Sequence, residues 1–269
     1  MSTTADGGHR LPYEVIEGGN GPYLFLVHGM LSSRRQWRPN LEALCRHARP
    51  VMFDLWGHGD APCPLDDESY QVRTIIGEFE RVRQELGAQR VLLCGQSLGA
   101  CFTLRYSFEH PERVIGQMFT NSMSALSPPG AFGDPAQRQA RAALIEAEGS
   151  SALAKLPFHP RHARRLPPEV RDELIEAADG VDPRAFARLS TITGPQLSVT
   201  TELHRITCPT LLVNGVWEKT FQPLRDIAVR DIPGCEVADL QAGHAVNLEN
   251  VAAFNQVVAE FLGRMAQVA

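Results

Sequence analysis

The chain lacks several features that define specialised classes of protein. Its six cysteines show no C-x-x-C spacing, so we expect free thiols and neither a disulfide framework nor a zinc site. No stretch approaches the roughly 18 apolar residues of a membrane span, and the first ten residues lack the apolar segment of a signal peptide. A net charge of -5 lacks the basic excess that phosphate contacts need. We therefore expect a cytoplasmic enzyme or binding protein with neither a membrane nor a nucleic-acid partner.

The 269 residues, 43% of them hydrophobic, are enough for one large α/β domain or for a domain that carries an insertion. Strand-like apolar runs at 23–27, 51–54, 91–94 and 114–120 alternate with helical patterns at 37–48, 70–86 and 100–110. Such alternation is typical of a parallel sheet with right-handed crossovers. An edge strand is expected at 11–17.

This alternation lapses between about residues 121 and 201. Helical patterns occupy 136–148, 168–178 and 183–193, and the alternation resumes with strands at 210–214 and 235–240, a helix at 222–229 and a last helix from residue 249. The fold class expected is α/β, a mostly parallel sheet flanked by helices with a helical cap inserted before the last two strands. Residues 1–121 and 202–269 would form the core domain, and residues 122–201 the cap.

Residues 91–100 (VLLCGQSLGA) contain the most informative local pattern, because a buried-strand composition breaks into G-x-S-x-G and a helix-compatible segment follows. This is the pattern of a nucleophile elbow, in which Ser97 occupies a sharp turn between strand and helix. Small neighbours two residues away are needed because strand and helix pack closely there, and Gly95 and Gly99 meet that need. Ser97 is therefore the candidate nucleophile.

A serine hydroxyl needs a base to remove its proton and a carboxylate to orient that base. His244 follows the apolar strand ending at Leu240 and precedes the last helix, so it is the candidate base. Glu218 follows another strand and is the candidate acid, which completes the order serine, acid, histidine.

Two alternatives to Glu218 as the acid remain open. Glu218 could pair with the adjacent Lys219 or with Arg225 as an ordinary surface carboxylate. The acid could instead be one of three aspartates farther along the chain, Asp226, Asp231 or Asp239.

An oxyanion hole requires two preorganised backbone N–H groups near the nucleophile. Leu98, the residue after Ser97, would supply one of them. The second would come from Met30, in the loop His28-Gly29-Met30 that ends an early strand.

Taken together, these motifs resemble the α/β-hydrolase fold family, in its small, cap-bearing serine esterase and lactonase branch. His28-Gly29 resembles the family's HG loop, Trp37 its frequent following tryptophan, and residues 54–62 its D-x-x-G-H-G turn, with Ala61 where the family usually carries serine. The serine chemistry expected at this site needs neither a metal nor an organic cofactor. The resemblance implies an aspartate as the usual acid, so Glu218 is a departure.

The same resemblance argues against some relatives. Haloalkane dehalogenases and epoxide hydrolases carry a nucleophilic aspartate at the position of Ser97, and carbon–carbon bond hydrolases typically carry tryptophan at the position of Ala245. The expected function is cleavage of a small-molecule carboxylic ester, lactone or thioester through an acyl-enzyme on Ser97. The alternatives are a small-molecule receptor with little turnover, an acyltransferase and a carbon–carbon bond hydrolase.

Residues beside the predicted catalytic positions are candidate walls of a substrate pocket. They are Gln96, Met30, Trp217, Phe221 and Val246. The basic run at 159–165 (HPRHARR) either attracts an anionic substrate or forms a solvated face. An oligomer is compatible with the sequence but is not indicated by it.

Overall fold

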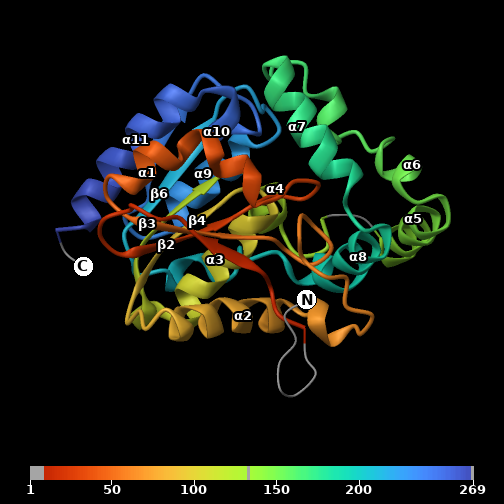
Figure 1. Ribbon diagram of the computed structural model, residues 1–269, viewed down its shortest axis with the longest axis horizontal. Helices are drawn as coiled ribbons and strands as arrows, with labels where there is room; N and C mark the ends of the chain where they lie inside the picture. Colours follow the sequence, from red (N-terminus) through yellow and green to blue (C-terminus); the bar gives the residue numbers. More distant parts are fainter. Residues whose placement is uncertain (1–8, 132–133, 268–269) are drawn as a thin grey trace.

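In the computed structural model, which describes residues 9–131 and 134–267, a seven-stranded sheet runs through the centre of the protein (Figure 1). The strand order is β1-β3-β2-β4-β5-β6-β7, and every neighbouring pair is parallel except the antiparallel edge pair β1 and β3. The strands are β1 Tyr13–Val15, β2 Tyr23–Val27, β3 Arg49–Phe53, β4 Val91–Gly95, β5 Val114–Thr120, β6 Thr210–Gly215 and β7 Glu236–Leu240. The expected mostly parallel sheet is confirmed.

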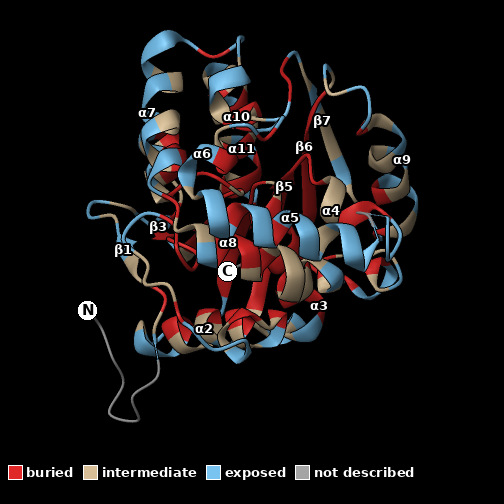
Figure 2. Ribbon diagram, turned by 90° about the vertical axis from the view of Figure 1, so that its right-hand side faces the viewer, coloured by how far each residue is buried: buried red, intermediate tan, exposed pale blue. Residues whose placement is uncertain are grey.

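Alternating side chains of the central strands enter two hydrophobic cores, one on each face of the sheet. In β2, Phe25 joins the core that includes Phe79 and Phe102, whereas Leu24 joins the core that includes Phe254. Helices α2 and α3 therefore cover one face, and α1 and α11 cover the other (Figure 1). The buried strands lie between these two layers in Figure 2.

The helices that cover the sheet are α1 Leu41–Cys45, α2 Val72–Glu85, α3 Leu98–Glu109, α9 Gln222–Asp231, α10 Val246–Glu249 and α11 Val251–Met265. Of these, α2, α3 and α9 begin and end close to the expected positions.

Between β5 and β6, the described residues form helices and connecting turns but no strand, as expected. The α-helices are α4 Met123–Leu126, α5 Pro135–Glu148, α6 Ser150–Leu153, α7 Pro168–Asp179 and α8 Pro183–Arg188. The Asp182 side chain accepts a 2.9 Å hydrogen bond from the Arg184 amide, which caps α8, and Pro183 occupies the first helical position. The outer faces of α5 and α7 are largely exposed (Figure 2). The division into a core and a cap at residues 121 and 201 stays a prediction.

Three helical predictions need correction. The helix expected at 37–48 is a 3-10 helix, Arg34–Asn40, followed by the short α1, and Pro39 lies inside the 3-10 turn, where it has no N–H for an α-helical bond. The helix expected at 183–193 ends as α8 at Arg188 and continues as a π-helix, Leu189–Thr193. The last helix starts at Val251 rather than at Glu249, because Asn250 leaves helical geometry and caps it through a 3.3 Å bond from the Ala253 amide.

All six cysteines are free, as expected. Within residues 9–131 and 134–267, no helix combines the length and apolar composition that crossing a bilayer would require.

Candidate active site

Ser97 lies in a strained turn between the end of β4 and the start of α3. Its φ of 52° and ψ of -112° are rare for a residue with a side chain. A Cβ on Gly95 would lie 2.6 Å from Ala100 Cα, and a Cβ on Gly99 would lie 2.8 Å from the His28 carbonyl oxygen. Both neighbours must therefore be glycine for the strand and helix to pack this closely, which is the geometry expected of a nucleophile elbow.

His244 and Glu218 are in direct contact, although 26 residues separate them. Both oxygens of the Glu218 carboxylate lie 3.0 Å from Nδ1 of the imidazole. An ionised carboxylate can only accept hydrogen bonds, so Nδ1 carries the proton and Nε2 keeps a free lone pair. The imidazole is thus held in the tautomer that a general base requires.

The three aspartates considered as alternative acids have other partners. Asp239 accepts hydrogen bonds from Asn214 Nδ2 at 2.7 Å and from Arg225 Nη2 at 2.9 Å. Asp226 pairs with Arg225, and Asp231 pairs with Arg230. Lys219 does not pair with Glu218; its ammonium donates to the Val216 carbonyl at 3.0 Å.

Two residues that the sequence reasoning missed connect the acid to the elbow. Asn121 Nδ2 donates to Glu218 Oε2 at 2.8 Å and to the Gly215 carbonyl at 3.1 Å, and Asn121 Oδ1 accepts from the Gly215 amide at 2.9 Å. The next residue, Ser122, donates from its hydroxyl to the Ser97 carbonyl at 2.7 Å. The only signal in the sequence was a pair of polar residues directly after a buried strand.

The contacts around Glu218 and His244 shift the pKa values of both side chains. Burial alone would raise the pKa of Glu218, but the hydrogen bond and charge of His244 and the Asn121 donor outweigh it, so that the pKa is lowered. For His244, burial lowers the pKa, whereas the hydrogen bond and charge of Glu218 and the charge of Glu249 raise it. The net result is a His244 pKa above its ordinary value.

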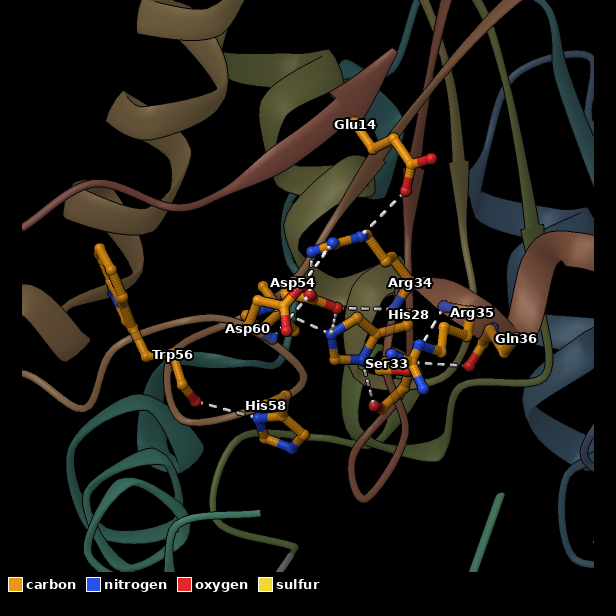
Figure 3. Close-up of polar contacts among 12 residues, drawn as sticks. Glu14, His28, Ser33, Arg34, Arg35, Gln36, Asp54, Trp56, His58 and Asp60 are labelled. Atoms are coloured by element: carbon orange, nitrogen blue, oxygen red, sulfur yellow. Dashed lines mark hydrogen bonds and ion pairs between the residues drawn. The ribbon is translucent and has the colours of Figure 1, made fainter. Parts of the chain in front are cut away.

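Two buried histidines hold the loop that carries Met30 (Figure 3). His28 Nε2 accepts from the Leu55 amide at 3.0 Å, and His58 Nε2 accepts from the Leu31 amide at 3.3 Å. Nδ1 of each ring faces a carbonyl oxygen, that of Gly29 for His28 and that of Trp56 for His58. Both rings are therefore neutral, in agreement with the lowering of both pKa values by burial, in His58 to about 3.

The candidate oxyanion-hole amides have no hydrogen-bond partner among the described residues. Within the described residues, neither the Met30 nor the Leu98 N–H donates a hydrogen bond to the protein. The loop also lies close to the elbow, because a Cβ on Gly29 would be 3.2 Å from Ser97 Cβ. Leu31, next to Met30, has a φ of 55°, and its amide donates a hydrogen bond to His58 Nε2.

An ionic network anchors the segment that follows this loop (Figure 3). Arg34 pairs with Asp54, Asp60 and, at 3.2 Å, Glu14. Asp54 is buried and also accepts from the Arg34 amide at 2.7 Å and the Asp60 amide at 3.0 Å. Asp54 therefore connects the D-x-x-G-H-G turn to the segment that follows the Met30 loop.

The candidate pocket walls occupy different environments. Trp217 is 40% exposed, Gln96 is 6% exposed and Met30 is half-buried. Phe221 and Val246 are fully buried in the two cores on opposite faces of the sheet, so both have a packing role. A contact between any of the five and a substrate stays a prediction.

Residues of the basic run at 159–165 make two separate sets of contacts. His159 is buried and lies 3.3 Å from Asp179, which also faces Arg161. Arg165 instead lies over the Trp217 ring, with Cζ 5.4 Å from the ring centroid, beside the loop that carries His244.

A cavity of about 290 Å³ lies between α7 and the 3-10 helix Arg34–Asn40. Arg35, Arg38 and Glu173 contribute to its lining, and none of Ser97, His244 or Glu218 does. Among the described residues, no three His, Cys, Asp or Glu side chains gather as a metal site would require.

The chain belongs to the α/β-hydrolase fold family, whose model matches residues 22–251. It is 24% identical to a Bacillus subtilis (strain 168) protein named "Putative 2-succinyl-6-hydroxy-2,4-cyclohexadiene-1-carboxylate synthase", over 97% of both chains. It is 26% identical to carboxylesterase YbfK of the same organism, over 92% of this chain and 83% of the relative. A solved structure of a thermophilic esterase from Thermogutta terrifontis superposes with a TM-score of 0.83 at 22% identity, covering 98% of this chain and 97% of that one. The relatives support a hydrolase-type activity.

Proposed function

We propose that the protein is a serine hydrolase that cleaves a carboxylic ester, lactone or thioester of a small molecule. Ser97 is the nucleophile, His244 the general base and Glu218 the acid that orients it. The observation that carries the proposal is the pairing of His244 Nδ1 with both oxygens of Glu218 at 3.0 Å, which leaves Nε2 free to accept a proton.

The positions of the three residues in the sheet support this assignment. Ser97 follows β4, Glu218 follows β6 and His244 follows β7, so all three come after the carboxyl ends of parallel strands. These ends meet at one edge of the sheet, which is where α/β proteins bind ligands. The strained backbone of Ser97 at the same edge is the conformation that a nucleophile elbow requires, which also supports the assignment.

The proposed reaction has two stages. The Ser97 oxygen attacks the acyl carbon while its proton passes to His244 Nε2, and the Met30 and Leu98 amides stabilise the oxyanion. His244 then protonates the leaving oxygen or sulfur, and an acyl-enzyme remains on Ser97. In the second stage, His244 removes a proton from water, which attacks the acyl carbon; the acyl–oxygen bond then breaks, His244 returns the proton to the Ser97 oxygen, and the carboxylic acid leaves.

The helical insertion supports a small-molecule substrate. We infer that residues 122–201 form a cap over the site, because Arg165 from this segment lies against Trp217, in the loop that also carries Glu218. The name of the relative carboxylesterase YbfK agrees with ester cleavage.

Steady hydrolysis of p-nitrophenyl acetate tests the proposal against the receptor alternative. We expect many turnovers per protein molecule, and a loss of at least about a thousandfold in Ser97→Ala, because the nucleophile is removed. Ser151→Ala, in which an exposed serine of α6 is changed, serves as the matched control and should retain full activity. A single equivalent of p-nitrophenol followed by a stall, or equal rates in Ser97→Ala and wild type, contradicts the proposal. A panel of short-chain esters, lactones and thioesters then identifies the preferred acyl group.

A further inference from the structure

Glu249, the last residue of α10, binds the backbone on both sides of His244. Its Oε2 accepts a hydrogen bond from the Gly243 amide at 2.8 Å, and its Oε1 accepts one from the Ala245 amide at 3.3 Å. Since Gly243 and Ala245 flank His244 in the chain, one carboxylate fixes the peptide groups before and after the imidazole.

The loop packs directly against this carboxylate. A Cβ on Gly243 would lie 2.8 Å from Glu249 Oε1 and 2.9 Å from Glu249 Oε2, which is closer than Cβ atoms approach other atoms in proteins. Glycine at position 243 therefore allows the approach that the two hydrogen bonds require.

Three charged groups from three different elements face the imidazole or the backbone of the loop that carries it. Glu218 comes from the loop after β6, Glu249 from α10, and Arg165 from the segment before α7, with its Nη1 2.9 Å from the same Gly243 Cβ position. The ammonium of the nearby Lys219 is turned to the Val216 carbonyl. Two carboxylates and one guanidinium thus lie against the loop that carries His244, and the two carboxylates raise the pKa of His244.

We propose that Glu249 is a positioning residue for His244: it fixes the backbone on either side of the base and stabilises the imidazolium that forms when Ser97 loses its proton. The role rests on the proposed function and adds a second carboxylate to the site. Glu249 touches neither the imidazole nitrogens nor the reacting atoms, so its effect reaches the reaction through His244. The raised pKa of His244, to which the charge of Glu249 contributes after burial and Glu218, is consistent with this role.

Glu249→Gln removes the charge and keeps the shape of the side chain. We expect the His244 pKa, measured by NMR titration of the imidazole without substrate, to fall by about 0.5–1 pH unit, because a nearby negative charge is lost. We expect kcat for ester hydrolysis to fall about tenfold with KM nearly unchanged, since Glu249 does not touch substrate. The NMR signal of the His244 imidazole is assigned by its absence in His244→Asn. Glu260→Gln, at an exposed glutamate of α11, is the matched control and should change neither the His244 pKa nor kcat.

Glu249→Asp separates the effect of the negative charge from the effect of the two hydrogen bonds to the backbone. The shorter side chain keeps its charge but cannot span both amides, so we expect a His244 pKa close to that of wild type and a reduced kcat. An unchanged His244 pKa in a folded Glu249→Gln protein overturns the proposal, and so does an unchanged kcat in Glu249→Asp. Because the titration needs no substrate, its result stands apart from the test of the reaction: a wild type without esterase turnover would overturn the proposed function instead.

Discussion

Asn121 Nδ2 donates a 2.8 Å hydrogen bond to Glu218 Oε2, which is also 3.0 Å from His244 Nδ1. The asparagine follows β5 and the glutamate follows β6, so neighbouring parallel strands bring together residues 97 positions apart. Because Asn121 also binds both backbone groups of Gly215, it connects the acid to the frame of the sheet. The candidate acid is thus held from two sides.

Asn121→Ala should lower kcat/KM about tenfold, because a hydrogen bond to a charged group contributes roughly 1.5–3 kcal/mol and its loss lets the carboxylate move. Steady-state kinetics measure the effect, and thermal melting measures the accompanying loss of stability. Asn255→Ala on α11 removes another side-chain amide that binds backbone and should leave kcat/KM unchanged. Equal kinetics in Asn121→Ala and wild type would show that Asn121 plays no part in holding the acid.

Glu218→Gln should lower kcat by roughly 10³- to 10⁴-fold, because an amide can donate to Nδ1 and so favours the tautomer with the proton on Nε2. Glu218→Asp keeps the charge on a shorter side chain and should lose less. Asp239→Asn is the control, since Asp239 pairs with Arg225. If Asp239→Asn is inactive and Glu218→Gln active, the acid has been assigned to the wrong residue.

The pH dependence of kcat/KM follows from the raised pKa of His244. The imidazole must be neutral to accept the Ser97 proton, so activity is full above this pKa and falls as the pH drops through it. We therefore expect the midpoint of the acidic limb to lie above the ordinary histidine value of 6.5, and to move to lower pH in Glu218→Gln. A wild-type midpoint below 6.5 would contradict a raised His244 pKa and show that burial outweighs Glu218 at this site.

Acid should destabilise the fold through His58, whose pKa burial lowers from 6.5 to about 3. Between these values, the unfolded chain binds a proton that the folded ring does not, so stability falls as the pH falls. From pH 7 to pH 5 this one group removes about 2 kcal/mol from the free energy of unfolding, at about 1.4 kcal/mol per pH unit below 6.5. Urea unfolding at both pH values measures the loss. His58→Asn should show a smaller change between them, and an equal change would assign the acid sensitivity to other groups.

The sheet could be predicted largely from local patterns. The expected bounds of the strands at 23–27 and 114–120 agree with β2 and β5, because buried central strands produce uninterrupted apolar runs. The elbow was visible because strand, glycine, serine, glycine and helix are consecutive in the chain, and the Ser97 backbone has the expected strain. Glu218 and His244 were proposed from their places after strands, and the structure brings them into contact.

Other features depend on contacts that no local pattern encodes. Asn121 reaches Gly215 and Glu218 only after β5 and β6 are paired, and Asn121 looks like any polar residue after a strand. The sequence pattern places Glu249 in a long terminal helix. In the structure, the chain leaves helical geometry at Asn250, so α10 ends at Glu249 and the Glu249 carboxylate binds the loop that carries His244. The apolar positions 221 and 246 gave no sign of whether they face a pocket or a core.

Covalent labelling by a fluorophosphonate tests the central claim, that Ser97 is an activated nucleophile. Intact-mass and peptide analysis of wild type should show one adduct, on the peptide that contains Ser97, and slower labelling in His244→Ala because the base is lost. Ser97→Ala should show no adduct. An adduct that persists in Ser97→Ala at the wild-type rate would contradict the account.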